Sequence, residues 1–193
     1  MEHPVDKVAK CAGQHLGILC KAKRLLNAEG LATLYKTRVR SVMEYCGPIW
    51  QNASKTALHK LDNIQRKACR SMGKHCDVIP ELNLSSLQHR RDISALCQVH
   101  RMISGTAPPS VLELLPKFAV QVKMSQQVTQ HHYYQLHIEC SKTEHHKNSL
   151  IPRYARCWNS LPVDCIYNQN GELNNLQSFK AKTNRWLLTC NIK

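Results

Sequence analysis

The chain lacks several features that mark common protein classes. No apolar run approaches the ~18 residues that a membrane-spanning helix needs, so a membrane protein is not expected. The first ten residues, MEHPVDKVAK, lack the basic-then-apolar layout of a signal peptide. The CxxC pairs of many zinc modules are also missing. These absences favour a soluble intracellular protein of the nucleus or cytoplasm that needs no cofactor.

Acidic residues are scarce. The 193 residues include 27 Lys and Arg but only 13 Asp and Glu, which gives a net charge of +14. The excess has two blocks: residues 1–80 hold 14 basic and 6 acidic residues, and residues 116–193 hold 10 and 4, while residues 81–115 hold three of each. A surface of this kind attracts polyanions, and nucleic acid is the commonest one inside cells. The alternative is a basic protein whose lysines are simply solvated.

The ten cysteines do not indicate disulfides, because the cytosol and nucleus keep thiols reduced. Most of them occupy apolar positions of helical patterns, where cysteine behaves as a small hydrophobic residue. We therefore expect Cys97 and Cys190 to be buried free thiols.

Apolar residues recur at helical spacing through the first 115 residues. Ser54 is a candidate N-cap, and Ser85 with Gln88 forms a candidate capping box. Glycines provide stops at Gly73 and Gly105. Gly30 separates the first two helices in this pattern, and Gly47-Pro48 ends the second. The expected helices cover 6–26, 31–45, 55–72, 85–104 and a short turn at 111–115.

Residues 116–148 follow a different pattern, in which apolar and polar residues alternate. This period of two predicts a short β-hairpin or loosely ordered extended segments that connect two parts. Helical patterns return near 152–160 and 176–190. The sequence thus predicts a mainly α-helical protein with a basic helical bundle at 1–115, a connector at 116–148 and a C-terminal helical segment at 149–193.

Six strings of the sequence occur together, in the same order, in one known family. They are KCAGQHLGILCKAKRLL (10–26), LYKTRVRSVMEYCGPIW (34–50), LHKLDNIQRKACR (58–70), LSSLQHRRDISAL (84–96), RYARCWNSLP (153–162) and SFKAKTNRWL (178–187). The chain resembles the region after the polymerase palm in the reverse transcriptases of non-LTR (LINE) retrotransposons, with the jockey and chicken-repeat elements as the most similar subgroup. The resemblance implies a thumb that grips the template–primer duplex, followed by a C-terminal extension.

Polymerisation itself is not expected. Phosphoryl transfer by a polymerase needs carboxylates that hold two metal ions, and this family supplies them from an Asp-Asp turn in the palm. The chain has no adjacent aspartates. Asp62 and Asp92 lie among basic residues of expected helices, where ion pairing is the simpler explanation. No residue is assigned a catalytic role.

The expected activity is sequence-independent binding to a primer–template, an RNA or duplex DNA through phosphate contacts. The candidate contacts are basic residues of the second and third helices, namely Lys36, Arg38, Arg40, Lys60, Arg66, Lys67 and Arg70. A further partner would be the palm of a parent reverse transcriptase. The alternative is a protein-interaction module, or an element remnant, with no nucleic-acid role.

Two other residue groups could carry chemistry. Histidines and one cysteine cluster between residues 131 and 146, but only His137 and Cys140 have a spacing that zinc sites use, so a polar linker is favoured over a metal site. Trp50, Trp158 and Trp186 could stack on bases, yet each lies on or near an apolar stripe, which favours core packing.

Overall fold

The structure is a computed structural model that describes residues 4–45, 47, 53–74, 82, 84–119, 132–138, 140 and 142–190. These residues are mainly helical, which confirms the predicted fold class. The chain divides into two compact units, Met1–Arg91 and Asp92–Lys193, which we call unit 1 and unit 2. Among the described helices, none combines the length and the hydropathy needed to cross a bilayer.

The division between the units differs from the boundary expected at residue 115. It falls inside helix α6 (Leu87–Ile103). The reason lies in packing: Leu87 belongs to the hydrophobic core of unit 1, whereas Leu96 and Val99 belong to the core of unit 2. One amphipathic helix therefore contributes to two cores, which a stripe of apolar residues does not reveal.

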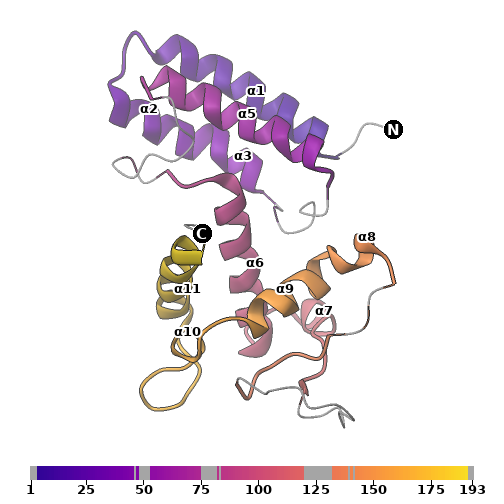
Figure 1. The fold of residues 1–193 in the computed structure, drawn as a ribbon. Coiled ribbons are helices and arrows are strands. Elements are labelled where there is room, and N and C mark those ends of the chain that lie inside the picture. The colour runs from indigo at the N-terminus through magenta and orange to yellow at the C-terminus, as the bar shows by residue number, and fades with distance from the viewer. Residues whose placement is uncertain are drawn as a thin grey trace. The chain divides into compact units, whose positions relative to one another are not determined.

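Unit 1 is built around three helical runs that lie alongside one another: α1 (Pro4–Ala22), the run from α2 (Ala28–Leu34) to α3 (Ser41–Glu44), and α5 (Lys55–Ser71) (Figure 1). Asp6 contacts Lys60 and Cys20 contacts Ser71, so α1 and α5 run in the same direction. Leu19, Tyr35, Val39 and Leu61 meet in the core and are fully buried. The middle run points the opposite way, as a short turn after α1 requires.

The second helix begins earlier than expected. The side chain of Asn27 caps it by accepting a hydrogen bond from the backbone N–H of Gly30 at 2.9 Å. Gly30 therefore lies in the first turn of the helix and does not separate two helices, as the sequence had suggested. Asn is among the best N-cap residues because its short side chain satisfies an unpaired N–H of the first turn.

The middle of this run is a π-helical segment, η1 (Tyr35–Arg40). Thr33, Thr37 and Ser41 each donate a side-chain hydroxyl hydrogen bond to the carbonyl four residues earlier. Such bonds compete with the backbone ladder and tend to bend a helix. We attribute the widened turn to them. The sequence pattern predicted a regular helix here because periodicity does not register these hydroxyl bonds.

Helix ends in both units mostly follow the predicted signals. The Ser54 hydroxyl accepts a hydrogen bond from the N–H of Ala57, which confirms it as the N-cap of α5. Gly73 and Gly105 have φ values of 78° and 70°, in the left-handed region that favours glycine. The cap of α6 is shifted by one residue, because Ser86, and not Ser85, accepts the hydrogen bond from His89 N–H.

Unit 2 has a core rich in rings. Trp158, Tyr154 and Phe179 are at most 1% exposed. The ring centroids of Trp158 and Phe179 are 5.4 Å apart, and the ring of His100 lies 4.5 Å from that of Phe179. After α6, the helices of unit 2 are α7 (Pro109–Leu112), α8 (Glu144–Lys147), α9 (Leu150–Asn159), α10 (Val163–Ile166) and α11 (Leu176–Cys190). Of these, α9, α10 and α11 supply residues to the core. The sequence did not predict the short helices α8 and α10.

Part of the segment 116–148, expected to be a connector, packs in this core through Phe118, Tyr134, Leu136 and Ile138. Phe118 and Leu136 form an antiparallel bridge, and Leu136 is 2% exposed. Asn159 of α9 bonds both backbone groups of Leu136, accepting from its N–H at 2.9 Å and donating to its carbonyl at 2.8 Å. The Trp158 indole N–H donates to the Tyr134 carbonyl at 3.0 Å. The hairpin alternative thus has an observed antiparallel pairing, while residues 120–131 lie outside the described part.

Candidate nucleic-acid interface

Helix α5 separates an apolar face from a basic face. Its buried side chains include Ala57, Leu61, Ile64 and Ala68, three or four residues apart, so they line one side of the helix. The opposite side carries the predicted cations: Lys60, Lys67 and Arg70 are exposed and Arg66 is half-buried. The sequence missed Lys55 and His59, which are also exposed. Lys55 and His59 are four residues apart, so helical spacing places them on the same face as Lys67 and Arg70. This spacing could have identified them from the sequence.

Lys60 is the one predicted cation of α5 with a described ion pair. Its ammonium lies 2.5 Å from a carboxylate oxygen of Asp6 on α1. The two side chains are 51% and 30% exposed, so the pair is a surface salt bridge that contributes little to stability. It nevertheless cancels one positive charge at this end of the helix. Lys67 and Arg70 contact no carboxylate within the described residues.

The cations of the middle helical run have mixed environments. Arg38 is exposed, while Lys36 and Arg40 are half-buried. The backbone carbonyl of Arg38 accepts a hydrogen bond from His15 Nδ1 of α1 at 2.8 Å. This contact fixes the backbone and leaves the guanidinium of Arg38 in solvent.

Arg40 takes part in an ion cluster inside unit 1. Its guanidinium lies 3.7 Å from a carboxylate oxygen of Glu44. The same carboxylate accepts two hydrogen bonds from Arg90, one from Nε and one from Nη2. Burial, and next the neighbouring Arg90, lower the pKa of Arg40 from its usual value. Bidentate binding by Arg90 raises the pKa of Arg90 itself. These contacts assign Arg40 a structural role, so it is the weakest of the predicted phosphate contacts.

Acidic side chains of unit 1 are largely engaged by cations. Besides Asp6 and Glu44, Asp62 lies 3.7 Å from Arg91, whose side chain is only 4% exposed. Glu29 is the remaining described acidic residue of the unit. Asp6 compensates Lys60, but no described carboxylate contacts Lys67 or Arg70. These two cations of α5 therefore face solvent with uncompensated charge, as a phosphate-binding surface requires.

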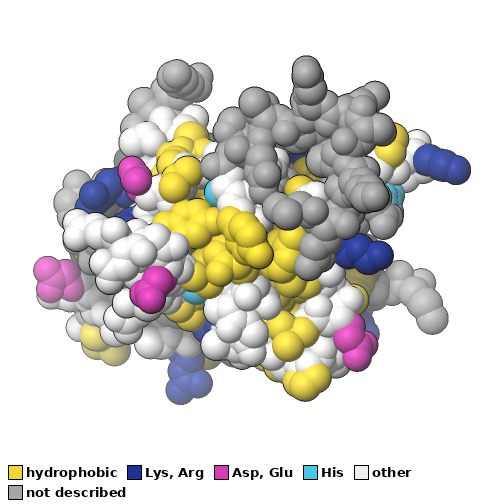
Figure 2. Space-filling model, turned by 90° about the horizontal axis from the view of Figure 1, so that it is seen from below, with side chains coloured by type: hydrophobic (Ala, Val, Ile, Leu, Met, Phe, Trp, Pro, Cys, Tyr) yellow, Lys and Arg dark blue, Asp and Glu magenta, His cyan; other side chains and the backbone are white. Residues whose placement is uncertain are grey.

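On the face shown in Figure 2, hydrophobic side chains form a band near the centre, and Lys and Arg side chains are dispersed toward the rim. The exposed cations on α5 follow a single helix face instead. This contrast favours α5 as the candidate interface.

The aspartates predicted to form ion pairs do so. Asp62 pairs with Arg91, and Asp92 accepts a hydrogen bond from the Tyr154 hydroxyl at 2.9 Å and lies 3.4 Å from Arg153. Burial and, next, the Asp92 charge raise the pKa of Tyr154 above its usual value, so the phenol stays protonated and acts as a donor. The Asp92 contacts hold α6 against α9 within unit 2, and the Asp62–Arg91 pair joins α5 to α6 within unit 1.

The cysteine and histidine expectations have mixed outcomes. The described cysteines are free, but Cys190 is exposed and Cys97 half-buried, so the prediction that both are buried was wrong. Cys190 is exposed because it ends α11, beyond the last core contacts. Among the described residues, no group of three His, Cys, Asp or Glu side chains is placed to hold a metal ion. His131 and the side chain of His145 lie outside the described part.

The tryptophans also divide. Trp158 is fully buried, and Trp186 packs half-buried against the core of unit 2, as the stripe pattern predicted. Trp50 lies outside the described residues.

No family model, curated protein or solved structure matches this chain.

Proposed function

We propose that the chain binds nucleic acid through phosphate contacts made by the outer face of α5. The observation that carries the proposal is that Lys67 and Arg70, exposed on one face of α5 beside half-buried Arg66, contact no carboxylate of the described residues. Lys60 on the same face pairs with Asp6. From Lys60 to Arg70 the helix rises about 15 Å, at about 1.5 Å per residue. A rod of this length presents its cations to several successive phosphates of one strand, which lie about 3.4 Å apart along the duplex axis.

Such contacts position a protein on nucleic acid without reading its sequence. The described α5 face offers ammonium and guanidinium groups together with the exposed side chains of His59 and Asn63. Binding to unrelated sequences of equal length should therefore be equal.

Within this proposal, the chain is a non-catalytic part of a reverse transcriptase of the non-LTR type. That assignment depends on the resemblance of the six sequence strings. Asp62 and Asp92 form ion pairs with Arg91 and Arg153. We expect no template-dependent incorporation of nucleotides by the homogeneous chain with Mg²⁺ or Mn²⁺. Measurable primer extension would contradict this part of the proposal.

The alternative of a protein-interaction module is favoured by a different observation. Ile18 and Leu25 of unit 1 are 61% and 86% exposed, which is unusual for large apolar side chains. These side chains could seat against another protein, such as the palm of a parent enzyme.

A salt titration separates the two functions. The equilibrium constant for a labelled duplex of random sequence is measured at several salt concentrations by fluorescence anisotropy. Phosphate binding predicts that log K falls linearly with log salt, by about 0.9 for each phosphate contact on duplex DNA. Failure to bind duplex or single strands at low salt, by a protein with intact helical circular dichroism, would move the assignment to the interaction module.

A further inference from the structure

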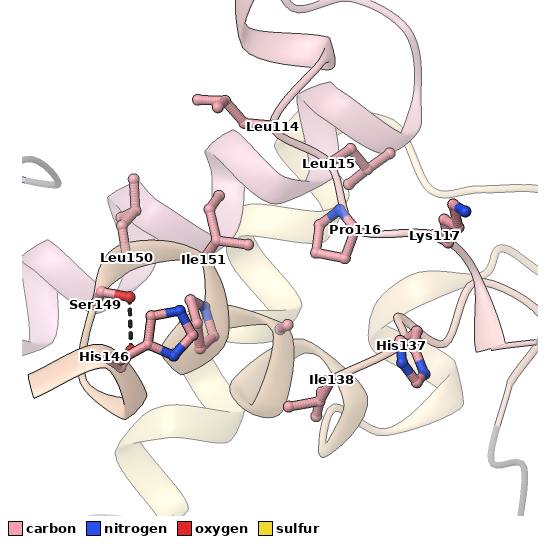
Figure 3. Close-up of a pocket in the computed structure, with 12 residues that line it drawn as sticks. Leu114, Leu115, Pro116, Lys117, His137, Ile138, His146, Ser149, Leu150 and Ile151 are labelled. Atoms are coloured by element: carbon pink, nitrogen blue, oxygen red, sulfur yellow. Dashed lines mark hydrogen bonds between the residues drawn. The ribbon is translucent and has the colours of Figure 1, made fainter. Parts of the chain in front are cut away.

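Unit 2 contains a cavity of about 760 Å³ beside the start of α9. Figure 3 shows its lining side chains, which come from the segment after α7, from the strand-like segment paired with it, and from the α8–α9 region. Most of the wall is aliphatic, and the Ser149 hydroxyl in it already donates a hydrogen bond to the His146 carbonyl at 2.7 Å. A wall of this kind selects no particular class of ligand. The charged surface of unit 1 is more selective.

Helices α1 and α5 meet along a line on the surface of unit 1, which we call the α1–α5 seam. Two side-chain contacts define it. Lys60 Nζ lies 2.5 Å from Asp6 Oδ1 toward the N-terminal ends of the helices, and Cys20 Sγ lies 3.4 Å from Ser71 Oγ at their C-terminal ends. The helices therefore lie side by side and parallel over about four turns of α1 (Figure 1). A polymer that lies along the seam meets side chains of both helices.

The outward face of α1 beside the seam carries two lysines outside the predicted set of phosphate contacts. Lys10 and Lys21 are both exposed. They are eleven residues apart, which places them within about 20° of each other around the helix, at about 100° per residue. Lys10 also lies one turn after Asp6, which contacts α5. Within the described part of the chain, neither lysine contacts a carboxylate.

Lys67 supplies the matching charge on α5. It is exposed, and it lies two turns after Lys60 and one turn before Ser71, the two α5 residues that contact α1. Helical spacing therefore places Lys67 on the side of α5 that borders the seam. Cations of two parallel helices thus flank the same line.

Asp6 is the one acidic residue in the sequence of α1, and it lies in the seam. Its pair with Lys60 is reached by water, because the two side chains are 30% and 51% exposed. An exposed pair of this kind contributes little to stability, so a phosphate that approaches Lys60 can replace the carboxylate as its partner. The acidic residue of α5, Asp62, pairs with Arg91 of α6 instead.

We propose that the α1–α5 seam is the phosphate-binding site of unit 1, with Lys10 and Lys21 of α1 as contacts alongside Lys67, and with Asp6 competing with phosphate for Lys60. This inference rests on the proposed function and extends its interface from one helix to two. Lys10 and Lys21 are roughly 16 Å apart along α1, at about 1.5 Å per residue. That length matches about five phosphate spacings of one strand.

The contribution of α1 is tested by removing its two lysines. Fluorescence anisotropy of the full chain with a labelled duplex of random sequence gives log K at several salt concentrations. Lys10→Gln with Lys21→Gln should flatten the slope against log salt by up to about 1.8, since each lost contact removes about 0.9. The matched control removes two exposed cations of α11, Lys180→Gln with Arg185→Gln, and should leave the slope nearly unchanged. Circular dichroism of each variant checks the helices.

The role of Asp6 predicts a change of the opposite sign. Asp6→Asn frees the Lys60 ammonium, so it should steepen the slope by about 0.9 and tighten binding up to roughly tenfold near 0.1 M salt. Damage to the fold would not tighten binding. Adding Lys60→Gln to Asp6→Asn should return the slope to that of the parent chain. Glu113→Gln, which removes an exposed carboxylate of unit 2, is the matched control and should leave the slope unchanged.

The outcomes separate this inference from the proposed function. A folded parent chain that binds no duplex at low salt contradicts both. A parent chain that binds, with a slope flattened by neutralising Arg66, Lys67 and Arg70 but unchanged by Lys10→Gln with Lys21→Gln, keeps the α5 interface and overturns the two-helix seam. Equal or weaker binding by Asp6→Asn overturns the competition between Asp6 and phosphate.

Discussion

Unit 1 and unit 2 differ in how their cores are built. Among the described residues, the unit 1 core consists mainly of aliphatic side chains together with Tyr35, and most of them come from three helical runs. The core of unit 2 gathers Trp158, Phe179 and Tyr154, with His100 among the rings, from short helices and extended segments. Long helices bury a stripe by packing side by side, whereas short elements need large rings and side-chain hydrogen bonds to hold them together.

The surfaces differ as well. In the described residues, unit 1 carries 16 Lys and Arg against 4 Asp and Glu, and unit 2 carries 9 against 5. The aliphatic bundle is therefore the strongly basic unit, and the ring-filled unit holds the apolar cavity. Within the proposed function, this contrast favours unit 1 as the unit that binds a polyanion.

Removing one ring from the core of unit 2 should have the largest effect on stability and should leave unit 1 unaffected. Trp158→Ala should destabilise unit 2 by about 3–5 kcal/mol, because it leaves a large void in a site that is fully buried. It also removes the indole donor to the Tyr134 carbonyl. Hydrogen exchange followed by mass spectrometry reads the units separately and should show lost protection in α9 and α11 with α1 and α5 unchanged. Equal loss in both units would show that they unfold together.

The charge contrast is tested by a triple variant. Arg66→Gln, Lys67→Gln and Arg70→Gln together should flatten the slope of log K against log salt by roughly two to three units, if all three side chains contact phosphate. The matched control removes three exposed cations of unit 2 instead: Lys142→Gln, Lys180→Gln and Arg185→Gln. It should leave the slope nearly unchanged. Equal flattening in both triples would mean that net charge, and not the α5 face, determines binding.

The same contrast explains what could be predicted from sequence. In unit 1, the stripe of Leu61, Ile64 and Ala68 correctly placed Lys67 and Arg70 outside, because a long helix keeps one periodicity. The ion pair of Lys60 with Asp6 joins residues 54 positions apart, and the Arg40–Glu44–Arg90 cluster joins two helices. Helical periodicity contains no information about such long-range contacts.

Unit 2 was harder to predict for a related physical reason. The pairing of Leu136 with Asn159 satisfies a backbone segment with a side-chain amide 23 residues away. Asn174 likewise donates to the Cys165 and Tyr167 carbonyls and thereby holds the end of α10. Short elements held by such bonds show no apolar periodicity of their own. The sequence pattern of residues 116–148 therefore predicts a connector. The cavity in unit 2, which combines residues of three segments, could not be found from any one pattern.

Helix capping offers a smaller test of the two units. Ser54 and Ser149 are both N-cap residues, but only the Ser54 side chain accepts a hydrogen bond from the first turn. Ser54→Ala should cost unit 1 about 1 kcal/mol, the usual contribution of a capping hydroxyl. Ser149→Ala should have a smaller effect on unit 2, because its hydroxyl donates to the His146 carbonyl instead. Urea titrations of the two variants compare them, and a larger loss in Ser149→Ala would contradict the assignment of the caps.

The smallest expected effect is a pH dependence confined to unit 2. The Nε2 atom of His100 lies 2.7 Å from the Asn174 carbonyl, which can only accept, so Nε2 carries the proton. The Nδ1 atom is buried without a described partner, so a second proton there would add an unsatisfied charged donor. Burial accordingly lowers the pKa of His100 below its usual value near 6.5. Because the unfolded state then binds the proton more tightly, unit 2 should keep its full stability above about pH 6.5 and lose some as the pH falls below that value. Hydrogen exchange at pH 7.5 and 5.5, corrected for the intrinsic exchange rate, should show this loss in α6 and α11 of the parent chain and not in His100→Gln. The exposed-histidine control His59→Gln keeps His100 and should show the same loss as the parent chain. A loss of equal size in His100→Gln, or its disappearance in His59→Gln, would assign the pH dependence to another group.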